Sequence, residues 1–126
     1  MGIKNLIITL FVSCVACFCG DNPDDGDLNC TEIYVYGLNV ILKNSETNEV
    51  VTNDVTVTAI EGDYQEELML IDFSPNFVGA GERPGLYVIH VTSPNYENYT
   101  SDEIFLDFDG CHVIPQALEI LLQPVE

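Results

Sequence analysis

Basic residues are nearly absent from this chain of 126 residues: Lys4, Lys43 and Arg83 stand against 21 aspartates and glutamates. The formal net charge at pH 7 is −18, and the acidic residues are spread along the sequence rather than gathered in one tail. Such a surface repels phosphate backbones and favours solubility. We therefore exclude nucleic acid as a partner and expect a well-solvated acidic domain.

The chain also lacks an apolar run long enough to cross a membrane. The N-terminal run ends at about Phe18, short of the roughly 20 residues that a spanning helix needs. Lys4 precedes this run, and the small residues Ser13 and Ala16 lie at its end, which is the order found in a signal peptide. The pattern predicts export, so the cysteines beyond the leader are disulfide candidates first.

Three cysteines crowd the end of this leader, in the stretch SCVACFCGDN. Zinc usually takes four ligands, and no fourth cysteine or histidine lies near Cys14, Cys17 and Cys19. The stretch CVAC instead resembles the lipobox of bacterial lipoproteins, in which a small residue precedes the cysteine that is acylated. The resemblance selects Cys17, directly behind Ala16, as the lipidated residue, with Cys19 and Cys14 as alternatives.

This resemblance implies a lipid-anchored protein of the cell envelope, an outer membrane lipoprotein that is periplasmic or surface-exposed. Residues 1–16 would form the signal peptide, and residues 17–29 a flexible acidic linker. The run GDNPDDGD resembles the acid-rich tethers of surface lipoproteins in the Bacteroidetes group. The implied partner is the membrane, through the lipid anchor. An ordinary secreted protein with incidental leader cysteines is the alternative.

Helical periodicity is missing from the rest of the chain, and short runs of alternating apolar and polar residues take its place. In the clearest run, GLYVIHV, we expect Tyr87, Ile89 and Val91 to face inward and His90 to face outward. The pattern predicts an all-β domain over residues 30–126, an antiparallel Greek-key β-sandwich of about seven strands. The predicted strands cover 38–43, 55–60, 66–72, 76–80, 86–92, 103–107 and 118–122.

Two cysteines remain, Cys30 just ahead of the first predicted strand and Cys111 just ahead of the last. The first and last strands of many Greek-key sandwiches lie side by side in parallel, which would bring the two cysteines to the same end. We therefore predict a Cys30–Cys111 disulfide. A reactive Cys111 thiol with His112 as its base is the disfavoured alternative, because adjacent strand residues point to opposite faces.

Several short motifs carry a family resemblance: Thr47-Asn48, Glu61-Gly62-Asp63-Tyr64, Pro84 to Val91, Pro94-Asn95-Tyr96 and Cys111-His112-Val113. Together they are similar to the carboxypeptidase regulatory-like domains of bacterial exported proteins, over roughly residues 30 to 124. Asparagine stands at positions 48 and 95 where the family has glycine. The resemblance implies a transthyretin-like prealbumin sandwich that serves as a stabilising, spacer or interaction module without chemistry or a cofactor of its own.

Catalytic motifs are missing as well. The chain has no G-x-S-x-G sequence. Its two histidines, His90 and His112, lie too far apart to resemble the iron ligands of intradiol dioxygenases. The C-terminal LLQPVE differs from the Tyr-Arg-Gly-Ser ending of hydroxyisourate hydrolases. We predict no enzyme, no catalytic residue and no metal site, with a small hydrolase as the least favoured alternative.

The predicted function is that of a non-catalytic module with a binding or structural role at the envelope, whose partner is an envelope protein or a glycan. Tyr96, Tyr99 and Phe105 are the candidates for an aromatic binding platform, although such residues more often pack within a sandwich. A calcium- or glycan-binding surface module is the alternative. Loop acids are candidates for calcium at one end of the sandwich. These acids are Asp63, Asp102 and Asp109.

Overall fold

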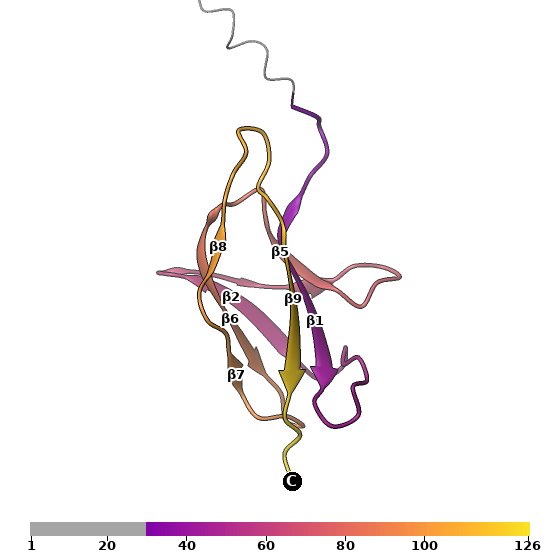
Figure 1. Ribbon diagram of the computed structural model, residues 1–126. Coiled ribbons are helices and arrows are strands. Elements are labelled where there is room, and N and C mark those ends of the chain that lie inside the picture. Colours follow the sequence, from indigo (N-terminus) through magenta and orange to yellow (C-terminus); the bar gives the residue numbers. More distant parts are fainter. Residues whose placement is uncertain (1–29) are drawn as a thin grey trace, which may run out of the picture.

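A computed structural model of the protein describes residues 30–126. The predicted signal peptide and linker, with the lipidation candidates Cys14, Cys17 and Cys19, lie outside the described residues. Within them, nine strands and no helix form two packed β-sheets (Figure 1). No helix in this part of the chain is long and apolar enough to cross a membrane. The predicted all-β class is confirmed.

One sheet has four strands and the other has five. The four-stranded sheet runs in the order β4 (Met69–Leu70), β5 (Phe77–Gly81), β1 (Tyr36–Asn44) and β9 (Gln116–Leu122). The five-stranded sheet runs in the order β3 (Tyr64–Glu67), β2 (Thr56–Glu61), β6 (Gly85–Thr92) and β7 (Tyr99–Thr100), and β8 (Ile104–Leu106) also pairs with β6.

The first and last strands lie side by side in parallel, as the sequence predicts. Their register runs from Leu38 opposite Gln116 to Asn44 opposite Leu122. The other strand pairs are antiparallel. This single parallel pair brings the segments that precede β1 and β9 to the same end of the domain, the upper end in Figure 1.

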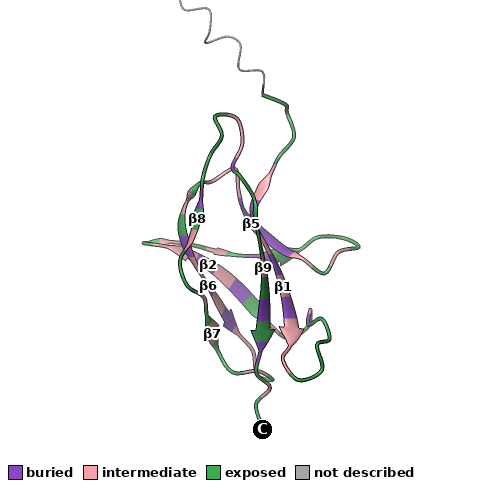
Figure 2. Cartoon of the chain, viewed as in Figure 1, coloured by how far each residue is buried: buried purple, intermediate pink, exposed green. Residues whose placement is uncertain are grey.

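The core lies between the two sheets and follows the two-residue period of the strands. Alternate residues of β1 and β6 are fully buried, including Leu38, Val40 and Leu42 in β1. Tyr87, Ile89 and Val91 in β6 are also fully buried, which confirms their predicted inward orientation. Figure 2 shows the buried residues alternating with more exposed ones along the strands. His90 on the outer face is only half-buried.

The predicted single strand over 66–72 is divided between β3 and β4, which belong to different sheets, and residues 71 and 72 lie in neither strand. Leu68 is the residue between β3 and β4. Its side chain is buried in the core, and its amide donates to the Val57 carbonyl at 2.8 Å. The sequence pattern also does not predict β7, which has only two residues and pairs with His90 and Val91 of β6. These two differences raise the number of strands from about seven to nine.

Candidate functional site

The two cysteines of the domain meet at the end where β1 and β9 begin. Cys30 and Cys111 lie at disulfide distance, with their Cα atoms 5.1 Å apart across a sequence separation of 81 residues. The segment before β1 and the loop before β9 are therefore joined, as the sequence predicts. Because Cys111 is committed to this pair, its thiol cannot serve as the nucleophile of the alternative Cys–His hypothesis.

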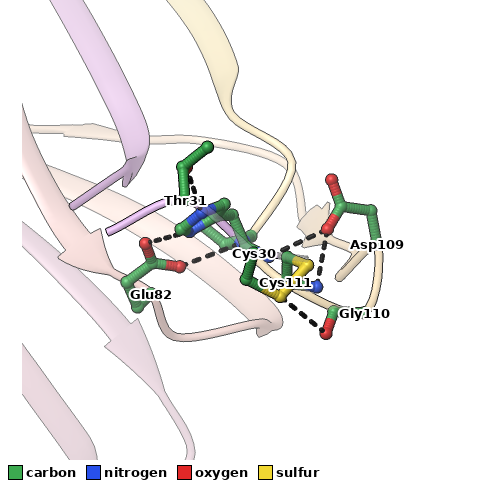
Figure 3. The surroundings of a disulfide bond; sticks show 8 residues. Cys30, Thr31, Glu82, Asp109, Gly110 and Cys111 are labelled. Carbon is green, nitrogen blue, oxygen red and sulfur yellow. Dashed lines mark hydrogen bonds and ion pairs between the residues drawn. A yellow bond between two sulfur atoms is a disulfide. The ribbon is translucent and has the colours of Figure 1, made fainter. Parts of the chain in front are cut away.

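The residues that follow the two cysteines also contact one another (Figure 3). His112 Nδ1 lies 2.6 Å from Glu82 Oε2, and its Nε2 lies 3.0 Å from Thr31 Oγ1. The Glu82 carboxylate also accepts the amides of Val35 at 2.9 Å and Val113 at 3.2 Å. Burial opposes the charge of Glu82, but the hydrogen bonds from His112 and the two amides hold its pKa below the ordinary value.

We call Thr31, His112 and Glu82 the relay, because a hydroxyl, an imidazole and a carboxylate follow one another as in a catalytic triad. Glu82 comes from the loop between β5 and β6, so the relay ties three distant segments together. None of the three lines the hollow at the other end of the sandwich, between the start of β2 and the end of β6. A sequence signal for two of them existed, since Thr31 and His112 each directly follow a cysteine of the predicted pair.

Asp109, one of the three calcium candidates, holds the turn that carries Cys111. Its Oδ1 accepts the amides of His112 and Cys111, each at 2.8 Å, and these bonds lower the pKa of Asp109. Asp63 lies in the turn between β2 and β3, and Asp102 lies between β7 and β8. No group of three metal-ligating side chains occurs within residues 30–126.

Both cationic side chains of the domain are engaged in the fold. Lys43 Nζ lies 2.6 Å from Glu119 Oε2. The Arg83 guanidinium pairs with Glu61, donates to the Tyr87 hydroxyl at 2.8 Å and stacks 3.6 Å from the centre of the Tyr64 ring. The hydrogen bond from Arg83 lowers the pKa of Glu61. Within the described chain, neither the lysine nor the arginine remains to receive an anionic ligand.

The three predicted binding aromatics are not brought together. Tyr96 and Tyr99 pack against the core, and Asn44 Nδ2 donates to the Tyr96 hydroxyl at 3.3 Å. Tyr99 pairs with Val91, whose side chain is buried, whereas Phe105 pairs with exposed Leu86. Directly paired residues point to the same face of a sheet. Tyr99 and Phe105 therefore lie on opposite faces, and only Phe105 is exposed, at 62%.

The most exposed apolar side chain of the described residues, Phe73, lies in a hairpin that the sequence pattern does not point to. We call residues 69–76, which comprise β4 and the loop that leads from it to β5, the apolar hairpin. Met69, Leu70 and Ile71 are exposed on it, and Phe73 near its tip is completely exposed. Phe73 has a φ of 62°, a left-handed conformation that is rare for a bulky residue. The Ser74 amide donates to the Ile71 carbonyl at 3.2 Å, which holds this turn.

The end of the sandwich opposite the Cys30–Cys111 pair contains an open hollow of about 480 Å³, between the start of β2 and the end of β6. Its base is the cross-strand pair Thr56 and Thr92. One wall comes from the segment that enters β2, with Asp54 and Val55, and the other from the loop after β6. Sequence reasoning missed this hollow, because its two walls are about forty positions apart in the sequence.

The two asparagines that replace glycine in the family motifs differ in conformation. Asn48 has a φ of 65°, the left-handed conformation that glycine favours. Asn95 is not among the left-handed residues of the described domain.

Neither the protein-family models nor the curated proteins that were compared with this sequence match it.

Proposed function

We propose that this chain is an exported, lipid-anchored, non-catalytic β-sandwich module with a binding role at the cell envelope. The signal-like leader and the CVAC stretch support export and acylation of Cys17. The Cys30–Cys111 pair suits an oxidising compartment. A high negative charge keeps such a displayed domain in solution.

We infer further that the sandwich is a Greek key of the transthyretin-like prealbumin type and belongs with the carboxypeptidase regulatory-like domains. The chain starts in the four-stranded sheet, alternates between the sheets and returns to pair β9 with β1. The motifs fall where that family has its turns: residues 61–64 join β2 to β3, and Pro84 directly precedes β6. These placements support the resemblance.

The binding role rests on one observation, the complete exposure of Phe73 on the apolar hairpin. A phenylalanine side chain left entirely in water contributes no apolar burial to folding, and its left-handed backbone conformation costs energy. A turn that is already fixed loses little entropy on binding. We infer that the apolar hairpin inserts into an apolar pocket of an envelope protein.

The lipid anchor is tested by palmitate labelling and intact mass. We expect Cys17→Ser to abolish labelling, because the acylated thiol is removed, and Cys14→Ser and Cys19→Ser to retain it. Both controls remove a neighbouring thiol from the same leader. Undiminished labelling of Cys17→Ser would contradict the assignment.

The apolar hairpin is tested by placing a photo-crosslinking amino acid at position 73 or position 105 in intact cells. Both native residues are exposed phenylalanines, so they form a matched pair. We expect a discrete adduct with one envelope protein from position 73 and none from position 105. Adducts of equal yield from both positions, or none from position 73, would count against the hairpin as the binding surface.

A small hydrolase is the second candidate function, and only the relay favours it. Thr31 would act as nucleophile and His112 as base, with Glu82 orienting the imidazole. The test is turnover of p-nitrophenyl acetate. Turnover that disappears in Thr31→Ala and persists in Thr47→Ala, which removes another exposed threonine hydroxyl, would establish the hydrolase. Equal rates for the two variants would exclude it.

A further inference from the structure

The hollow between β2 and β6, at the end of the sandwich opposite the disulfide, is lined mainly by side chains that are able to form hydrogen bonds. Val57 and Val91 point into the core, so the neighbouring Thr56 and Thr92 point outward and stand side by side at its base. Asp54 lies on one wall and Asn98 on the other. The hollow therefore combines a carboxylate, an amide and several hydroxyl groups in one concave surface.

These polar groups have few partners inside the protein. Among the hydrogen bonds of residues 30–126, none involves the side chains of Asp54, Thr56, Thr92 or Asn98. Ser93 Oγ accepts the Asn95 amide at 3.0 Å, which leaves its hydroxyl proton free to be donated. Asp54 has a φ of 57°, so the chain adopts a left-handed turn at the rim. Donors and acceptors are thus available to a ligand.

The chemistry of the hollow selects one class of ligand. An anion would meet Asp54 and no cation, because Lys43 and Arg83 are paired elsewhere. A bare metal ion prefers several oxygen ligands of the protein, and only one carboxylate lines the hollow. A neutral saccharide fits, since its hydroxyls donate to a carboxylate and accept from threonine hydroxyls and an asparagine amide.

We propose that the hollow between β2 and β6 is a binding site for a neutral saccharide, with Asp54 accepting hydrogen bonds from adjacent sugar hydroxyls. Its volume of about 480 Å³ lies within the range of roughly 300–1,000 Å³ for small-molecule pockets. Pro94, in the loop after β6, supplies apolar contact for the C–H groups of a sugar ring. The site is separate from the apolar hairpin and from the lipid anchor, and does not depend on either.

The test is an NMR titration of the isotope-labelled, purified full chain with neutral oligosaccharides built from glucose, mannose, galactose, xylose or N-acetylglucosamine. We expect at least one of them to shift the amides of Thr56, Thr92 and Asn98. Asp54→Asn should weaken binding about tenfold, the effect of losing a hydrogen bond to a charged group. Asparagine also tolerates the left-handed backbone, so this variant keeps the turn.

Asp63→Asn is the matched control, because it removes the same charge from the turn at the other end of β2. Thr92→Val is the second variant, since it removes a hydroxyl from the base and keeps a β-branched residue in the strand. Unchanged spectra with the whole panel, or equal weakening in Asp54→Asn and Asp63→Asn, would overturn the proposal. Calcium chloride alone shifting the same amides, with no effect of any saccharide, would also overturn it.

Discussion

The two ends of the sandwich differ in how their polar groups are used. At the disulfide end, Glu82 accepts three hydrogen bonds and Asp109 accepts two. At the hollow end, the side chain of Asp54 takes part in none of the hydrogen bonds or ion pairs formed within residues 30–126. Partnered groups stabilise a fold, whereas unpartnered groups in a concave surface remain available to a ligand.

Aspartates that look alike in the sequence have different surroundings at the two ends of the sandwich. Asp54 and Asp109 are both loop aspartates, and of the two only Asp109 is among the calcium candidates predicted from the sequence. Only the contacts distinguish them: the Asp109 carboxylate is satisfied by backbone amides, and these hydrogen bonds lower its pKa. We therefore expect changes at the disulfide end to reduce stability and changes at the hollow end to reduce binding.

Removal of the disulfide should have the largest effect on stability. The pair closes a loop across 81 positions, and restriction of the unfolded chain by such a loop contributes about 3 to 5 kcal/mol. We expect the double substitution Cys30→Ser and Cys111→Ser to lower the free energy of unfolding by that amount, measured by urea titration. A loss no larger than that of a typical surface substitution would show that other contacts hold this end.

Glu82→Gln should destabilise the domain by a smaller amount that depends on pH. The pKa of Glu82 is lowered on folding, so its carboxylate stabilises the fold above the unfolded pKa, ordinarily about 4.3. This contribution disappears as the pH falls through the lower folded pKa. The difference in melting temperature between wild type and Glu82→Gln should therefore be largest near pH 7 and shrink on acidification below about pH 4.3.

Glutamine keeps the shape of the Glu82 side chain. Glu119→Gln is the control for the loss of one charge from this acidic chain, because the Glu119 carboxylate pairs only with Lys43 on the surface. A constant difference across the whole pH range would mean that Glu82 acts through packing and not through its charge. The same result for both variants would assign the effect to net charge.

Much of the fold could be predicted because it follows from local alternation. β1 and β6 are long, and their apolar residues repeat with the period of a strand, so their inner faces are readable in the sequence. The cysteine pairing was predictable because both residues precede strands at the ends of the domain. β7 could not be predicted, because a strand of two residues is too short to show an alternating pattern. The change of sheet at Leu68 could not be predicted either, because the residues around it keep the local pattern of one strand.

The sites were harder to predict because they depend on register between distant strands. Thr56 meets Thr92 only through the pairing of β2 with β6, and Tyr99 and Phe105 face opposite ways only through their positions against β6. A shift of one residue would exchange the faces. The side-chain patterns of single strands do not determine which distant residues pair, so neither the hollow nor the separation of the aromatics is visible in the sequence.

Substitutions at the hollow end should have the smallest effect on stability. Measuring that effect is the sharpest test of the difference between the two ends. The Asp54 and Thr92 side chains have no hydrogen-bond partner among the described residues, so Asp54→Asn and Thr92→Val should change the free energy of unfolding by no more than about 0.5 kcal/mol. Urea titration in the absence of saccharide measures this directly. A loss comparable to that of the disulfide variant would mean that the hollow is part of the structural framework, and the functional contrast between the two ends would then be wrong.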